Sequence, residues 1–120
     1  MSGVRPVLWV GSSQRDLRRF PAAVRRMMGF ALYLAQHGQK HPNARPLIGF
    51  GGASVLEIVE EHDGDAYRGV YTVLFAEAVY VLHAFQKKSK RGAKTPLAEI
   101  ALIKERLRRA RAHHEGVEEP

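Results

Sequence analysis

The chain contains no cysteine, and this absence excludes disulfide bonds, thiolate nucleophiles and cysteine-based zinc sites. No stretch approaches the roughly 18 consecutive apolar residues of a membrane span, and the N-terminus shows no small-residue cleavage pattern. We therefore expect a cytoplasmic protein without a membrane partner. The 120 residues are enough for a single domain with one hydrophobic core.

Patterns typical of metal and phosphate-loop sites are also missing. Among the six histidines, His37 and His41 are separated by Gly38 at the end of a predicted helix, and no pair has usable ligand spacing. The glycine-rich residues 49–52 are not followed by the Gly-Lys-Ser/Thr of a phosphate-binding loop. We predict neither a metal nor a cofactor.

Positive charge is present in excess, and it is concentrated in the last third of a chain whose formal net charge is +7. Residues 86–111 hold ten Lys or Arg side chains and two acidic ones, whereas the rest of the chain is close to neutral. Such a concentration is typical of proteins that contact a polyanion, either nucleic acid or an acidic protein segment. The basic segment, residues 85–95, is therefore the first candidate for a functional surface.

The N-terminal part is predicted to form a short strand and a helical pair. Residues 7–10 are a short apolar run that ends in a turn signal. Apolar side chains within residues 17–34 recur at intervals of three and four, which indicates an amphipathic helix. Because Pro21 interrupts this pattern, we expect two helices, the second beginning near Pro21 and ending at Gly38.

The middle of the chain is predicted to form a long loop and three strands. Residues 38–52, with two prolines and four glycines, are interpreted as the loop. Three runs rich in β-branched and aromatic residues follow, at residues 55–59, 67–75 and 78–85. Asp63-Gly64 is a strong hairpin signal, so we expect an antiparallel meander.

A last helix is predicted to follow the basic segment, with Thr95 as its N-cap and Pro96 at its first position. Its buried stripe is predicted to be Leu97, Ile100, Ile103, Leu107 and Ala110. Its outer face is predicted to carry Lys104, Arg106, Arg108, Arg109 and Arg111. The element order is β-αα-βββ-α, an α+β domain over residues 1–112 with helices on one face of a small antiparallel sheet. Residues 113–120 are predicted to be a flexible tail.

Arg68 lies in the middle of a predicted strand, where a charged side chain needs a partner. It could form a structural ion pair with Glu57 on the neighbouring strand. It could instead bind a phosphate beside the basic segment. Phe85 is either a core residue or a platform on which a base stacks. The residues alone leave these alternatives open.

Four segments together resemble the RelE/HigB-type toxin superfamily, and its HigB-like, phage-associated branch in particular. They are residues 55–58, 65–71, 81–89 and 94–100. In order they supply a Val-Leu-Glu-Ile strand, a Tyr-Arg strand, a His-x-Phe-x-Lys-Lys segment and a Lys-Thr-Pro helix start. The likeness covers about residues 53–107, and the fold that it implies is RelE-like.

The resemblance implies the toxin of a type II toxin–antitoxin system, a ribosome-dependent, metal-independent mRNA endonuclease that inhibits translation. It also implies a cognate antitoxin, expected to be a helix-turn-helix protein. In such enzymes the RNA 2′-hydroxyl attacks the adjacent phosphate. By position, Arg68 matches the phosphate-stabilising arginine of the family, and Lys87 and Lys88 fall in its basic segment. Glu57 and His83 are the candidates for the general base, although His83 also suits a hydrogen-bonded place in the core.

Further candidate RNA contacts are Lys90, Arg91, Lys94, Phe85, Arg45 and Lys40. The chain departs from the family at Val59, where a basic residue is common and where Glu60 and Glu61 follow. Two alternatives therefore stay open. One is a non-enzymatic toxin of ParE type acting on DNA gyrase, and the other is a catalytically inactive, phage-derived RNA-binding module.

Overall fold

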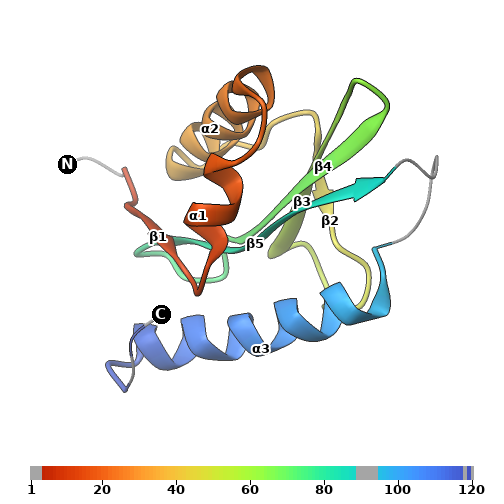
Figure 1. Cartoon of the computed structure of the whole chain (residues 1–120). Helices are drawn as coiled ribbons and strands as arrows, with labels where there is room; N and C mark the ends of the chain where they lie inside the picture. The colour runs from red at the N-terminus through yellow and green to blue at the C-terminus, as the bar shows by residue number, and fades with distance from the viewer. Residues whose placement is uncertain (1–3, 89–94, 118, 120) are drawn as a thin grey trace.

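The computed structural model describes residues 4–88, 95–117 and 119. Its elements are β1 (Val7–Trp9), α1 (Ser13–Arg18), α2 (Ala22–Gln36), β2 (Ala44–Pro46), β3 (Val55–His62), β4 (Asp65–Thr72), β5 (Val79–Lys88) and α3 (Leu97–His114). The predicted α+β class, the helical pair and the three-stranded meander are confirmed (Figure 1). The last helix continues to His114, two residues beyond the predicted end of the domain.

The strands form one mixed sheet in the order β1-β5-β4-β3-β2. β1 runs parallel to β5, and the other neighbours are antiparallel. The hairpin turn falls at Asp63 and Gly64, which both have positive φ angles, as the sequence predicted. β2 lies inside the predicted loop of residues 38–52 and pairs with β3. A strand of three residues is too short to give a periodic pattern, so the sequence did not reveal it.

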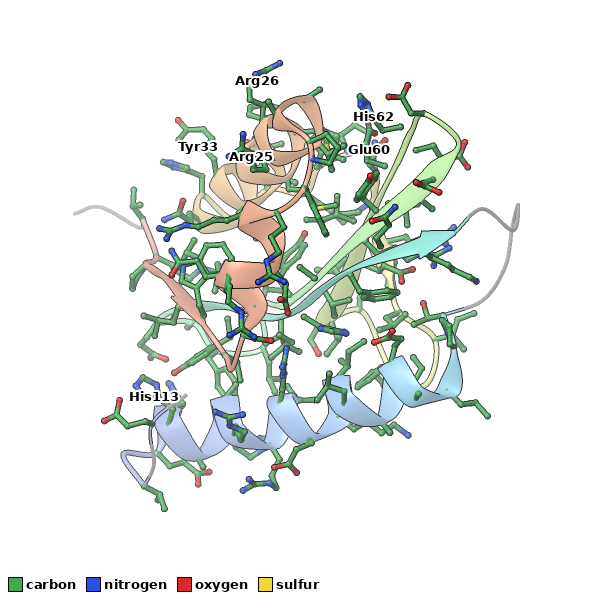
Figure 2. All side chains as sticks on the ribbon, in the orientation of Figure 1. Arg25, Arg26, Tyr33, Glu60, His62 and His113 are labelled. Carbon is green, nitrogen blue, oxygen red and sulfur yellow. The ribbon has the colours of Figure 1, made fainter. Side chains whose placement is uncertain are left out.

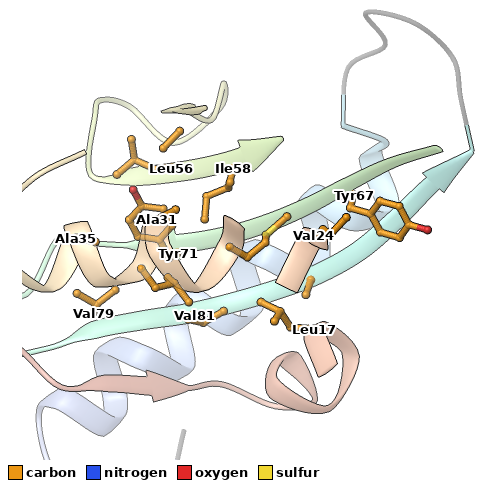
Figure 3. Close-up of a cluster of buried hydrophobic side chains, with 14 of the residues drawn as sticks. Leu17, Val24, Ala31, Ala35, Leu56, Ile58, Tyr67, Tyr71, Val79 and Val81 are labelled. Carbon is orange, nitrogen blue, oxygen red and sulfur yellow. The ribbon is translucent and has the colours of Figure 1, made fainter. Parts of the chain in front are cut away.

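Helices cover both faces of the sheet, and the expectation that they gather on one face is wrong (Figure 1). On one face, α2 packs Val24 and Ala31 against strand residues such as Ile58, in the cluster that Figure 3 shows. On the other face, Ile103 and Ala110 of α3 belong to a second cluster. Two layers are needed because the central strands carry apolar side chains in both directions.

α3 differs from its predicted form at three positions. Pro96 occupies the N-cap, and the Thr95 hydroxyl bonds to Glu57 on β3 instead. Leu97 is 86% exposed, although the helical pattern placed it in the buried stripe. Arg106 is 8% exposed, although the pattern placed it on the outer face. An arginine side chain can be buried where polar groups accept its hydrogen bonds. Helical periodicity does not reveal these acceptors, because they belong to other elements.

A β-bulge in β5 supplies one of these partners. Val70 of β4 pairs with His83 and Tyr71 pairs with Val81, so Leu82 is the extra residue. Its carbonyl accepts a hydrogen bond of 3.1 Å from Arg106 Nη1. The bulge changes the phase of the strand, and Phe85 therefore lies in the cluster on the α3 side rather than under α2.

The Arg106 guanidinium also binds the turn before α1. Its Nη2 donates to Ser12 Oγ at 3.0 Å, and Ser12 Oγ donates to an Asp16 carboxylate oxygen at 2.7 Å. Burial lowers the pKa of Arg106 from its ordinary value. Gly11 makes room for this contact, because a Cβ at Gly11 would lie 2.9 Å from Arg106 Nε. The contact thus joins α3, β5 and the start of α1.

Gly11→Ala should destabilise the protein more than Gly38→Ala does. Both glycines have positive φ angles, so each alanine meets backbone strain of about 1–2 kcal/mol. Only Gly11 adds the contact with Arg106, since nothing lies within 4 Å of a Cβ at Gly38. Urea unfolding of both variants should show an additional loss of about 1–3 kcal/mol for Gly11→Ala. Equal losses would contradict the tight Gly11–Arg106 contact.

Candidate functional site

A cleft of about 510 Å³ lies on the α3 side of the sheet, between the first turns of α3 and the strands β2 to β4. Its described lining residues are Arg45, Pro46, Leu47, Ile48, Gly49, Glu57, Arg68, Thr95, Leu97, Ile100 and Lys104. Three of them, Glu57, Arg68 and Arg45, were singled out from the sequence. The structure therefore brings distant candidates together at one concave site.

The floor of the cleft is a buried ion pair between neighbouring strands. Arg68 Nη1 lies 3.1 Å from both carboxylate oxygens of Glu57. Arg68 is 4% exposed and Glu57 is 2% exposed. The two interpretations of Arg68 are thus compatible, because the arginine is paired with Glu57 and also faces the cleft.

The Glu57 carboxylate is the centre of a wider set of contacts. Thr95 Oγ1 donates to Glu57 Oε2 at 2.6 Å and accepts from Arg68 Nη1 at 3.3 Å. Arg45 Nη2 lies 3.5 Å from Glu57 Oε1, and the Arg45 side chain is 61% exposed. Because donors surround this carboxylate, the geometry makes Glu57 the group that orients the two arginines.

The cleft combines positive charge with apolar walls. Its described lining contains three cations, Arg45, Arg68 and Lys104, and a single carboxylate. The apolar lining includes Ile48 and Leu97, which are 82% and 86% exposed at the rim. A site that is partly screened from water strengthens the attraction between its cations and an anion. The arrangement suits an anionic ligand that also carries apolar surface.

His83 lies behind the cleft and is not one of its lining residues. It is 6% exposed, and its Nε2 lies 2.6 Å from Glu99 Oε1. Its Nδ1 lies 3.3 Å from Arg106 Nη1, which can only donate, so Nδ1 accepts and Nε2 carries the proton. Its contacts are those of a hydrogen-bonded core residue, and its role as general base stays a prediction.

The other candidates on β5 differ in their surroundings. Phe85 is 9% exposed, pairs with Arg68 in the sheet and stacks on His83 with ring centroids 4.9 Å apart. Lys87 lies two residues after Phe85 on β5 and pairs with Ala66 of β4. Strand alternation therefore places the Lys87 side chain on the α3 side of the sheet, as it does for Phe85. Phe85 therefore forms part of the wall behind Arg68, and Lys87 continues that side of the sheet toward the basic segment.

The remaining candidates lie elsewhere. Lys88 pairs with Asp65 at the end of β5, and Lys90, Arg91 and Lys94 fall outside the described residues. Lys40 donates from Nζ to the Ala44 carbonyl at 2.8 Å. It borders a separate hollow of about 200 Å³ and is not one of the lining residues of the larger cleft.

Sequence reasoning missed two polar contributors to the cleft. Lys104 was assigned to the outer face of the last helix, and Thr95 was assigned to its N-cap. The spacing of Leu97, Ile100 and Lys104 is the available signal, since residues three and four apart share one face of a helix. No comparable signal exists for Thr95, whose partner Glu57 is 38 residues away.

The part of the chain that the structure describes holds neither a metal-binding cluster nor a membrane-spanning helix. No group of three or more His, Cys, Asp or Glu residues within residues 4–88, 95–117 and 119 is arranged to hold a metal ion. Over the same residues, no helix has the length and apolar character that crossing a bilayer requires.

Comparisons with known proteins point to one family and one fold. The sequence profile of a family described as "Phage derived protein Gp49-like (DUF891)" matches residues 15–108. No curated protein matches the sequence. Among solved structures, the isolated RelE toxin of E. coli is similar with a TM-score of 0.53 and 18% identity. The match covers 84% of this chain and 98% of the RelE chain, so the expected RelE-like fold is confirmed.

Removing the Glu57 carboxylate should destabilise the protein far more than removing the Arg45 guanidinium. Glu57→Ala leaves the buried Arg68 without its ion-pair partner, which typically costs about 3–5 kcal/mol. Arg45→Ala removes a mostly exposed partner, which typically costs about 0–1 kcal/mol. Urea unfolding at neutral pH compares the two variants. Similar losses would mean that the Glu57–Arg68 pair does not stabilise the fold.

Proposed function

We propose that this chain, which belongs to the Gp49-like family of phage-derived proteins, is the toxin of a type II toxin–antitoxin system. We further propose that it cuts mRNA on the ribosome without a metal ion, and that it therefore acts in the cytoplasm. The observation that carries the proposal is the cleft, where a guanidinium oriented by a buried carboxylate lies among further cations. The RelE-like fold and the phage-derived family support the assignment as a toxin.

The cleft offers two kinds of contact to an RNA strand. Arg45 and Lys104 are exposed, so they can meet phosphate oxygens as the strand approaches. Arg68 is already held by Glu57 and Thr95, so little reorganisation is needed when a phosphate arrives. Preorganised donors of this kind stabilise charge that develops in a transition state.

In the proposed reaction, the 2′-oxygen of RNA attacks the adjacent phosphorus while the bond from phosphorus to the 5′-oxygen breaks. The products are a 2′,3′-cyclic phosphate and a free 5′-hydroxyl. One proton leaves the 2′-hydroxyl and one is taken up by the 5′-oxygen, so the step needs no further reactant. Arg68 on β4 would stabilise the negative charge on the non-bridging oxygens, together with Lys87 and Lys88 on the neighbouring strand β5.

The proposed antitoxin would cover this cleft. An acidic segment of the antitoxin would pair its carboxylates with Arg45 and Lys104. An apolar side chain of the same segment would pack against Ile48 and Leu97, which are exposed at the rim. We expect the partner to be a small helix-turn-helix protein encoded beside this one. Such a segment would compete with RNA for the same cations.

Arg68→Gln should lower RNA cleavage on the order of 100-fold, because one preorganised donor at the reacting phosphate is lost. Arg108→Gln is the matched control, since Arg108 is exposed on α3 and is not a lining residue of the cleft. Each protein is induced in cells, growth is followed and the 5′ ends of mRNA are mapped. The wild type and Arg108→Gln should create the same new 5′ ends.

Normal growth and no new 5′ ends with the wild type would overturn the nuclease proposal. A DNA-damage response without RNA cleavage would instead indicate the ParE type. RNA binding without turnover would indicate the inactive binding module.

Glu57→Gln separates a positioning role from proton abstraction. If Glu57 only orients Arg68, as its contacts indicate, cleavage should fall by about tenfold or less and keep the wild-type pH profile. Loss of a general base would lower the rate about 10²- to 10⁴-fold. Single-turnover cleavage of ribosome-bound mRNA across a pH series measures both quantities. A loss in the larger range with a flattened pH profile would assign Glu57 as the base.

A further inference from the structure

Four aromatic rings form a continuous row on the outer side of α2 and just beyond its end, here called the ring row, and three of them are exposed. Phe30 and Tyr33 are stacked with centroids 6.3 Å apart and an interplanar angle of 16°. The His41 ring lies edge-on to Phe30 with ring centroids 5.7 Å apart, and the ring centroids of His37 and Tyr33 are 4.4 Å apart. Phe30 and Tyr33 are each 52% exposed, so half of a large apolar surface faces water.

The ring row is not explained by packing of the core. The buried stripe of α2 contains Val24, Met28 and Ala31, which face the sheet. Phe30 and Tyr33 lie on the opposite side of the helix, and Figure 2 shows Tyr33 pointing away from the sheet. Two half-exposed rings at adjacent helical positions form a patch that is typical of a binding surface.

The charge around the ring row has a single sign on this helix. Arg25 and Arg26 are both exposed in the first turns of α2, and Figure 2 shows Arg26 projecting outward. α2 contains no acidic residue. Gly29 lies between the arginines and the rings, with nothing within 4 Å of where a Cβ would stand. At this position no side chain separates the arginines from the rings.

We infer that the ring row is a second RNA-binding surface, on which unpaired bases stack while Arg25 and Arg26 contact the phosphates. Exposed rings beside cations are the combination that binds single-stranded nucleic acid, because every base has a face that can stack. The inference rests on the proposed function, since RNA is the ligand of both surfaces. It goes beyond the cleft, because α2 and α3 cover opposite faces of the sheet.

With the cleft and the ring row as separate surfaces, the protein can hold two segments of the same RNA molecule or complex at once. Binding at the ring row would raise the effective concentration of a second RNA segment near the cleft, provided that the two segments can span the sheet. The ring row would thus increase affinity without taking part in the chemistry.

Fluorescence anisotropy with a short labelled RNA tests the inference. The RNA carries 2′-O-methyl groups, so it binds without being cut by attack of a 2′-hydroxyl. Phe30→Ala and Tyr33→Ala should each weaken binding about tenfold, as expected for loss of one stacking ring. The control is Leu74→Ala, which shortens a 41%-exposed apolar side chain between β4 and β5 and should leave binding unchanged.

Two further arms separate stacking from charge. On an abasic oligomer of the same length, the ring variants should bind like the wild type, because there are no bases to stack. The double variant Arg25→Ala/Arg26→Ala should lower the slope of log affinity against log salt by about 1.4, which corresponds to two phosphate contacts on a single strand. If the double variant keeps the full slope, Arg25 and Arg26 do not contact the phosphates and are not part of the RNA-binding surface.

Equal RNA binding by the wild type and both ring variants would overturn the inference and leave the proposed function intact. A partner protein that loses affinity for the same variants, while RNA binding is unchanged, would reassign the ring row as a protein interface. A wild type that binds and cuts no RNA would overturn the proposed function as well.

Discussion

The β-bulge in β5 and the arginine that binds it determine how the rest of the structure is arranged. The extra residue Leu82 shifts the alternation of the strand, so that His83 and Phe85 lie toward α3 instead of α2. Arg106 donates to the Leu82 carbonyl and to Ser12, and so joins the last helix to the turn before α1. A buried cation is stable only with such partners, and this requirement fixes the position of α3 on the sheet.

The position of α3 in turn creates the cleft. Thr95 and Lys104 reach the cleft because α3 covers the face of the sheet that carries Glu57 and Arg68. There Glu57 and Arg68 neutralise one another's charge while Arg45 and Lys104 add positive charge. The opposite face of the sheet is covered by α2, whose outer side carries the ring row. The same two-layer packing thus separates a polar concave site from an exposed aromatic surface.

The reliable expectations from sequence were those that rest on local patterns. Helical spacing located α1 and α2, and Asp63-Gly64 located the hairpin, because each signal depends on neighbours within a few residues. Errors arose where long-range contacts decided the outcome. Thr95 bonds to Glu57 instead of capping α3, and Arg106 is buried, because their partners come from other strands.

By itself, the sequence determined the α+β order of elements apart from β2, the basic character of the chain and the candidates Glu57, Arg68 and Arg45. Composition and short-range periodicity are sufficient for the elements and the charge, whereas the candidate residues also rest on the resemblance to the RelE/HigB-type toxins. Only the tertiary structure decided that the three residues share one cleft, that His83 turns toward Glu99, and that helices cover both faces of the sheet. Strand register and the phase shift at Leu82 control these placements, and both depend on pairing between residues far apart in the chain.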